Sequence, residues 1–161
     1  VSALPVLLKK HPVPVHILKA SAYKLACDPA VAPCLCLHPP IFEEQVEGIR
    51  MRSFPTPHDS MGSVGYRIGN FAYLTDMNYI APEEVEKLRG IDTLVINALR
   101  WESHSSHFSV SEAVDIIKRV APRIAYLTHA SHRIGLHSEL EHRLPEGVKM
   151  AYDGLEIEIN E

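Results

Sequence analysis

Long apolar runs are missing from this chain of 161 residues. No stretch approaches the roughly 18 consecutive apolar residues that a membrane-spanning helix needs, so we expect no membrane span. The first residues lack a basic segment followed by a long apolar one, so no signal peptide is visible. Cysteine is also scarce, and Cys27, Cys34 and Cys36 are an odd number of thiols that do not indicate a disulfide scaffold. Together these absences predict a cytoplasmic protein.

An excess of basic residues is absent as well. The formal net charge of −4 argues against strong binding to nucleic acid, although it does not exclude an enzyme that cuts nucleic acid at a metal. The chain has no glycine-rich phosphate loop and no Gly-x-Ser-x-Gly motif, which disfavours Ser-His-Asp hydrolysis. Its apolar content of 46% is ordinary for a globular protein. At this length, we expect residues 1–161 to form a single domain.

Patterns of apolar residues predict strands that alternate with helices. The pair Gly69-Asn70 between two strand-like runs is a strong hairpin signal. The motif Ser109-Val-Ser-Glu112 is a capping box that opens a helix. The alternation predicts a layered α/β (α+β) fold. The expected strands are 14–18, 48–54, 64–68, 71–75, 93–99, 123–128, 148–152 and 155–159, the expected helices are 20–26, 82–88, 109–120 and 138–143, and 29–40 is expected to be a loop.

Several side chains that bind metals come directly after strand-like runs. His58 follows Pro-Thr-Pro, Asp76 follows Tyr-Leu-Thr, and His129 follows another Leu-Thr, with His132 three residues later. Two histidines and a carboxylate are ligand types that zinc, iron and manganese prefer. The sequence therefore predicts a metal site. Alternatives remain open: His58 as a plain loop residue, Asp76 as a turn cap, and His129 with His132 as caps of the sheet end.

Other polar groups allow further interpretations. His107, in the polar loop that begins at His104, could donate a proton or contact an oxyanion, or it could simply be solvated. A mononuclear iron oxygenase is disfavoured because the ligands of such enzymes usually come from a different strand architecture. The group of Cys27, Cys34, Cys36 and His38 could hold a structural zinc, but its spacing matches no common zinc motif. Free or buried thiols are therefore favoured.

The order of the motifs along the chain is informative. The motifs are Pro-His58-Asp, Val64-Gly-Tyr-Arg-Ile, Tyr73-Leu-Thr-Asp76, Leu94-Val-Ile-Asn97-Ala-Leu-Arg, His104-Ser-Ser-His107-Phe, Leu127-Thr-His129-Ala-Ser-His132 and Ala151-Tyr-Asp-Gly-Leu. With these motifs, residues 50–159 resemble the C-terminal two-thirds of a metallo-β-lactamase-fold hydrolase, in the branch that includes cyclic phosphodiesterases of phosphonate breakdown. The family's His-x-His-x-Asp-His motif occurs nowhere in the 161 residues.

The resemblance implies a partial αββα sandwich with a dinuclear metal site of zinc or manganese. By position, His58 would bind the first metal, Asp76 would bridge both metals, and His129 would bind the second. His107 would contact the substrate phosphate and protonate the leaving group. His132 could join a structural zinc. Asn97 stands where an aspartate is often found.

The function that follows is metal-dependent hydrolysis, most simply of a phosphodiester by a metal-activated hydroxide. The substrate would be a small phosphoester or nucleotide-like molecule. Because the first metal motif is missing, we expect this chain alone to bind metal at reduced occupancy and to be weakly active or inactive. A non-catalytic remnant or assembly domain of the same fold, and a lactonase or thioesterase, remain alternatives. Exposed sheet edges would also allow a homo-oligomer.

Overall fold

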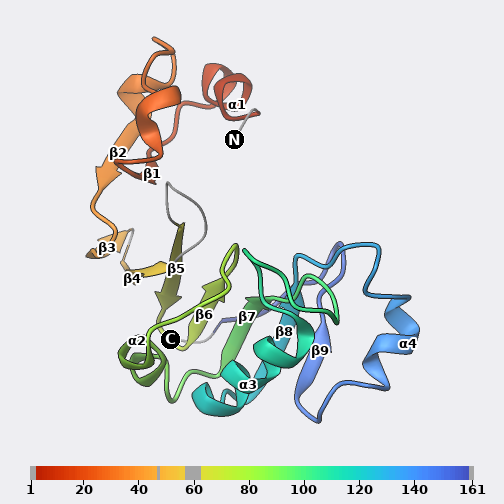
Figure 1. Ribbon diagram of the computed structural model, residues 1–161. Coiled ribbons are helices and arrows are strands. Elements are labelled where there is room, and N and C mark those ends of the chain that lie inside the picture. Colours follow the sequence, from red (N-terminus) through yellow and green to blue (C-terminus); the bar gives the residue numbers. More distant parts are fainter. Residues whose placement is uncertain (1–2, 47, 57–62, 160–161) are drawn as a thin grey trace. The chain divides into compact units, whose positions relative to one another are not determined.

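The structure is a computed structural model that describes residues 3–46, 48–56 and 63–159. The chain divides into two compact units, Val1–Phe42 and Glu43–Glu161 (Figure 1). That residues 1–161 form a single domain therefore stays a prediction. Among the described residues, no helix is both long and apolar enough to cross a membrane.

The first unit is built on a small parallel sheet. Strands β1 (Val15–Leu18) and β2 (Leu35–His38) pair in parallel, with His16 opposite Cys36. Buried side chains of Leu8, Leu25 and Val31 form its core. The remaining elements are α1 (Leu4–Lys10) and the 3₁₀ turns η1 (Ala22–Lys24) and η2 (Ala32–Cys34).

Two predictions for this unit are wrong. An α-helix was expected over 20–26, but the structure has the 3₁₀ turn η1 there instead. The segment 29–40, expected to be a loop, contains η2 and β2. The prolines of this segment suggested a loop, but β2 is stabilised by pairing with β1, and this distant partner leaves no local sequence signal.

The second unit is built on a seven-stranded sheet, counted over the described residues, in the order β3-β4-β5-β6-β7-β8-β9. The strands β3 to β6 pair antiparallel, and β6 to β9 pair in parallel. The predicted hairpin is confirmed, and Gly69 takes the positive φ of 54° that its turn requires. The strands are β3 (Glu43–Val46), β4 (Ile49–Thr56), β5 (Ser63–Ile68), β6 (Phe71–Leu74), β7 (Thr93–Asn97), β8 (Ile124–Thr128) and β9 (Val148–Met150).

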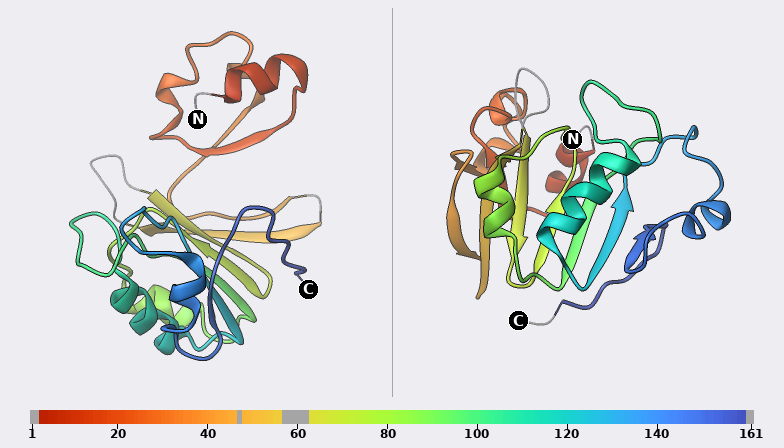
Figure 2. Two further views of the ribbon diagram at one scale, coloured as in Figure 1. Left: turned by 90° about the vertical axis from the view of Figure 1, so that its right-hand side faces the viewer. Right: turned by 60° about the horizontal axis from the view of Figure 1, so that its bottom comes forward.

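Helices α2 (Pro82–Lys87) and α3 (Val110–Val120) cover one face of this sheet (Figure 2). The core between the layers is contributed by β7, which is buried along its whole length, and by the apolar stripe of α3. A third helix, α4 (His137–Glu141), lies between β8 and β9 in the chain. This arrangement confirms the predicted α/β layering. The strand expected at 155–159 is wrong, since the structure assigns no strand there.

Close packing fixes the positions of β4, β5 and β6 near the end of the sheet that carries the metal-type residues. A Cβ atom added to Gly65 on β5 would lie 2.6 Å from a methyl of Leu74 and 2.7 Å from the ring of Phe54. Both neighbours are buried and have little room to move. Only glycine allows these strands to pack this closely.

Candidate metal centre

Three side chains meet at one edge of the second unit's sheet. Asp76 follows β6, His107 lies between β7 and α3, and His129 follows β8. Their ligand atoms all lie within 4.8 Å of one another. They meet because β6, β7 and β8 are adjacent and parallel, so that their carboxyl ends share one edge.

The carboxylate stands between the two imidazoles. The Oδ1 atom of Asp76 lies 3.4 Å from Nε2 of His107 and 3.4 Å from Nε2 of His129. The two rings are stacked, with centroids 4.8 Å apart and planes inclined by 9°. The His107 side chain is 13% exposed, whereas the other two are nearly half exposed. The centre is therefore open to solvent on one side and backed by protein on the other.

Two of the three residues hold unusual backbone conformations. Asp76 has φ of 55° and His129 has φ of 60°, both in the left-handed region. A non-glycine residue there costs about 1–3 kcal/mol, and such strain concentrates at functional sites. The turn at His129 also prevents the segment 129–132 from continuing as a helix. His129 and His132 therefore do not share a helical face, and His132 is exposed.

A buried amide holds the turn that carries Asp76. Asn97, at the end of β7, is fully buried. Its Oδ1 accepts a hydrogen bond from the backbone N–H of Met77 at 3.2 Å, and its Nδ2 donates to the Met77 carbonyl at 3.0 Å. A carboxylate could accept the first bond but could not donate the second. Asparagine therefore fits this position and aspartate does not.

Main-chain hydrogen bonds to residues 77, 98 and 99 hold the residues next to His107 and His129. The Phe108 N–H, next to His107, donates to the Met77 carbonyl at 2.9 Å, and Leu99 N–H donates to the Phe108 carbonyl at 2.9 Å. Beside His129, the Thr128 carbonyl accepts from Ala98 N–H at 2.9 Å. Residues 97–99 thus connect all three turns.

The ring of His107 has a second polar partner. Its Nδ1 lies 2.8 Å from the hydroxyl of Ser106, which also lies 3.2 Å from Nδ1 of His104. This contact fixes the ring with Nε2 facing Asp76. The roles of Asn97 and Ser106 in positioning these residues are not evident from the sequence. The only available signal was that Asn97 ends a continuously apolar strand, where a polar side chain needs a buried partner.

The structure describes three of the four residues predicted at the metal site and its substrate side. Asp76, His107 and His129 are brought together, whereas His58 lies outside the described residues. The Asp76 carboxylate and the His129 imidazole, whose Oδ1 and Nε2 atoms lie 3.4 Å apart, are ligand types that zinc and manganese take, and His107 Nε2 lies 3.4 Å from the same carboxylate oxygen. The donor set of the described residues therefore fits a divalent metal.

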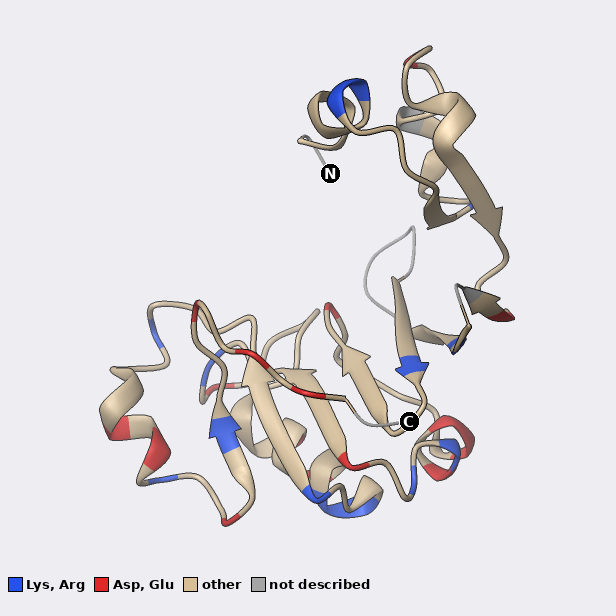
Figure 3. Cartoon of the chain, turned by 180° about the vertical axis from the view of Figure 1, so that it is seen from behind, with Lys and Arg blue, Asp and Glu red and all other residues tan. Residues whose placement is uncertain are grey.

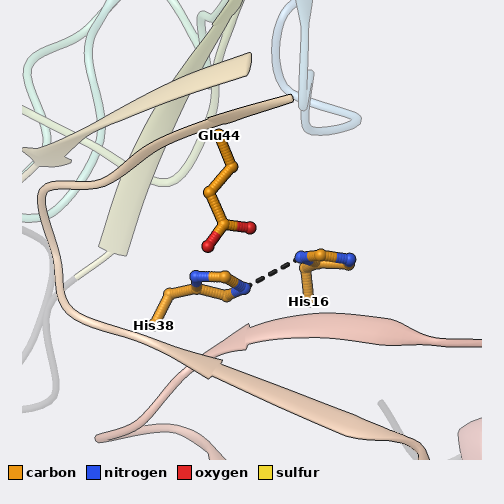
Figure 4. Close-up of side chains that lie close together, drawn as sticks. All are labelled: His16, His38 and Glu44. Atoms are coloured by element: carbon orange, nitrogen blue, oxygen red, sulfur yellow. Dashed lines mark hydrogen bonds between the residues drawn. The ribbon is translucent and has the colours of Figure 1, made fainter. Parts of the chain in front are cut away.

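The first unit holds a different histidine pair. His16 Nδ1 and His38 Nε2 lie 2.8 Å apart and form an N–H···N hydrogen bond (Figure 4). The buried His38 ring also stacks on Phe42, with centroids 4.1 Å apart. No group of converging metal-type donors among the described residues includes a cysteine. All three cysteines are free, and the thiols of Cys27 and Cys34 face backbone carbonyls.

Comparison with known proteins gives consistent results. Residues 25–130 match the family model described as a beta-lactamase superfamily domain. The chain is 38% identical over 128 residues to an octanoyltransferase from Porphyromonas gingivalis, covering 79% of this chain and 26% of that protein. It superposes on a diphosphatase of the PhnP family with a TM-score of 0.82 and 30% identity, covering 92% of this chain and 59% of that one.

A more distant structural neighbour carries a metal. Zinc-bound PqqB from Methylobacterium extorquens superposes with a TM-score of 0.73 and 15% identity, covering 99% of this chain and 69% of that one. At this identity the likeness concerns the fold alone. The chain spans 26% of the curated relative and 59% of the diphosphatase, so the activity of a longer protein does not transfer directly.

Proposed function

Since this chain belongs to the beta-lactamase superfamily and has the metallo-β-lactamase fold, we propose that it acts as a metal-dependent hydrolase of small phosphodiesters. The family and fold predicted from the sequence motifs are confirmed, and the reaction and substrate are the proposal. The observation that carries it is the meeting of Asp76, His107 and His129 at one sheet edge.

In this proposal, Asp76 and His129 would hold divalent metal, together with His58. The two oxygens of the Asp76 carboxylate allow it to contact two ions, which a single imidazole nitrogen cannot do. Bound zinc or manganese would supply the positive charge that makes water nucleophilic near neutral pH and stabilises the phosphate oxygens. The left-handed backbone at Asp76 and His129 supports this assignment, because strain is retained where the geometry of a side chain matters.

His107 acts on the substrate. The Ser106 hydroxyl holds its Nδ1, so Nε2 is presented to the centre. As an imidazolium, His107 binds a phosphate oxygen by a charge-assisted hydrogen bond. It then donates the Nε2 proton to the leaving oxygen as the phosphorus–oxygen bond breaks, and it is left as a neutral imidazole.

The phosphodiester is favoured over an acyl ester for a specific reason. The solved structure with 30% identity is named a diphosphatase, and this chain spans 59% of it. The curated relative is named an octanoyltransferase, but this chain spans only 26% of it. A lactonase or thioesterase on the same fold, and a non-catalytic remnant, are outcomes that the assay below distinguishes.

We also propose a location, a domain organisation and an assembly state for the protein. We place it in the cytoplasm, which the free thiols support. We also retain residues 1–161 as a single domain and self-association through sheet edges as proposals. His132, exposed in the structure, keeps its proposed role at a structural zinc.

The roles of His107 and Asp76 can be separated in the full natural protein. We expect His107→Ala to lower the turnover of a nitrophenyl phosphodiester about 10²-fold with metal content unchanged. Asp76→Ala should instead lose metal, as measured by elemental analysis of the purified protein. The exposed His142→Ala is the matched control and should change neither quantity.

The same proteins test the reaction class. Faster turnover of a thioester or lactone than of the phosphodiester would replace the phosphodiesterase with one of those activities. Metal bound with no turnover of any ester would favour the non-catalytic alternative. Loss of metal in His107→Ala with retention in Asp76→Ala would reverse the two roles.

A further inference from the structure

A pocket rich in arginine lies at the opposite end of the sheet from the candidate metal centre. Gly69 and Asn70 line it and precede β6, whereas Asp76 follows β6. The pocket has a volume of about 340 Å³, within the size range of small-molecule sites. Its other lining residues are Glu43 on β3, Arg50 and Arg52 on β4, and Arg67 on β5.

The strand register places these charges on one face. Arg52 is directly opposite Glu43 on one side and Arg67 on the other. Arg50 is two residues before Arg52 and so points to the same face. Figure 3 shows the basic positions on β4 and β5. Three guanidinium groups therefore surround the pocket with a single carboxylate.

Two of the arginines have fixed partners. Glu43 pairs diagonally with Arg50, although Arg52 is its direct neighbour across the strands. Arg67 donates from Nε to the Gly69 carbonyl at 3.0 Å and from a terminal nitrogen to the Lys87 carbonyl at the end of α2. Carbonyl oxygens hold the Arg67 guanidinium in place without neutralising its charge.

Arg52 is in a different situation. Within the described part of the chain, its side chain has no hydrogen-bond or ion-pair partner, and it lies opposite another arginine. Two of the three acids of α2 are already paired, Glu84 with Lys87 and Glu86 with Arg89. Like charges directly opposite on neighbouring strands destabilise a sheet. A bound anion would remove this repulsion.

We propose that this pocket is a binding site for a small molecule with phosphate groups, with Arg52 as its central ligand and Arg67 beside it. The planar guanidinium group donates two parallel hydrogen bonds that match the oxygens of a phosphate group. Arginine at all three basic positions suits such contacts better than lysine would. The net charge of −4 favours a small anion over a nucleic-acid strand. The site is independent of the proposed hydrolase function.

The test is a calorimetric titration of the full chain with pyrophosphate, in excess EDTA at about 0.15 M ionic strength. EDTA removes metal from the candidate centre, so failure of the hydrolase proposal would not affect the result. We expect saturable binding that Arg52→Gln weakens at least about tenfold and Arg52→Lys weakens less. Arg89→Gln, an exposed arginine outside the pocket, is the control and should bind like the wild type.

A stability measurement separates a ligand from a structural residue. Without pyrophosphate, Arg52→Gln should melt at a higher temperature than the wild type because the repulsion from Arg67 is removed. With pyrophosphate, the wild type should gain stability and Arg52→Gln should not. A lower melting temperature for Arg52→Gln without ligand would make Arg52 structural and overturn the proposal. Equal binding by all variants, no binding, or binding of a single-stranded oligonucleotide but not of pyrophosphate would also overturn it.

Discussion

His129 combines an unfavourable backbone with a side chain in the candidate centre. Its φ of 60° is one that glycine adopts freely, yet the residue is histidine. Asp76 shows the same combination, with φ of 55°. At both positions the strain is stored where a side chain faces the shared centre. A stability cost in exchange for the position of a side chain is characteristic of functional residues.

The strain at His129 can be measured by substitution. We expect His129→Gly to be more stable than His129→Ala by about 1 kcal/mol in the free energy of unfolding, because only alanine keeps a Cβ in the left-handed region. Urea denaturation of both variants measures the difference. Lys149, exposed in β9, is the control, and there alanine should be more stable than glycine. Equal stability of the two His129 variants would mean that the turn carries no strain.

Some of these residues could be recognised from sequence and others could not. Asp76 and His129 were predicted because each ends a strand with an unusual polar residue. Asn97 was noticed, but its partner Met77 is 20 residues earlier in the chain, and no sequence pattern reveals that contact. His107 was found through its polar loop, whereas its distance from Asp76 depends on the order of the strands.

Helix α3 illustrates an element that the sequence specifies locally. Ser109 accepts a hydrogen bond from Glu112 N–H at 3.4 Å, and the Glu112 carboxylate accepts one from Ser109 N–H at 2.7 Å. Both contacts span only three residues, so the motif alone predicted where the helix begins. Strand β2 is the opposite case, since its partner β1 is distant in the chain.

The capping box makes stability depend on pH. Hydrogen bonds from the Ser109 hydroxyl and backbone hold the pKa of Glu112 below its ordinary value of 4.5. A lowered pKa in the folded state adds stability above pH 4.5, and this stability is lost as the pH falls through the folded-state pKa. We expect Ser109→Ala to cost about 1 kcal/mol at neutral pH and less in acid. Urea denaturation at several pH values measures this, and a cost that grows in acid would contradict it.

At the scale of the whole molecule, the parallel half of the sheet assembles the centre. The expectation of layered α/β structure was sufficient to predict that β6, β7 and β8 could bring their ends together. It was not sufficient to predict the antiparallel edge strand β3, which has a short polar sequence. The order of the strands depends on packing between distant segments, and the sequence patterns do not contain it.

Metal binding should stabilise the folded protein. An ion at 100 times its dissociation constant adds about 2.7 kcal/mol to the free energy of unfolding. We expect zinc or manganese, added after removal of metal by EDTA, to raise the melting temperature of the full natural protein. Asp76→Ala should abolish most of the rise, and His16→Ala should retain it. A rise that depends on His16 but not on Asp76 would place the metal at the histidine pair of the first unit.

The main-chain contacts of residues 97–99 determine which nearby positions tolerate substitution. This segment secures the three turns of the candidate centre through main-chain groups and one amide, and these contacts do not depend on which side chains occupy residues 100–105. The side chains of residues 100–105 can therefore be exchanged without displacing Asp76, His107 and His129, whereas Ser106 must stay because its hydroxyl holds the His107 ring. In the proposed hydrolase, selectivity for new esters can be acquired in that loop while the candidate centre stays intact.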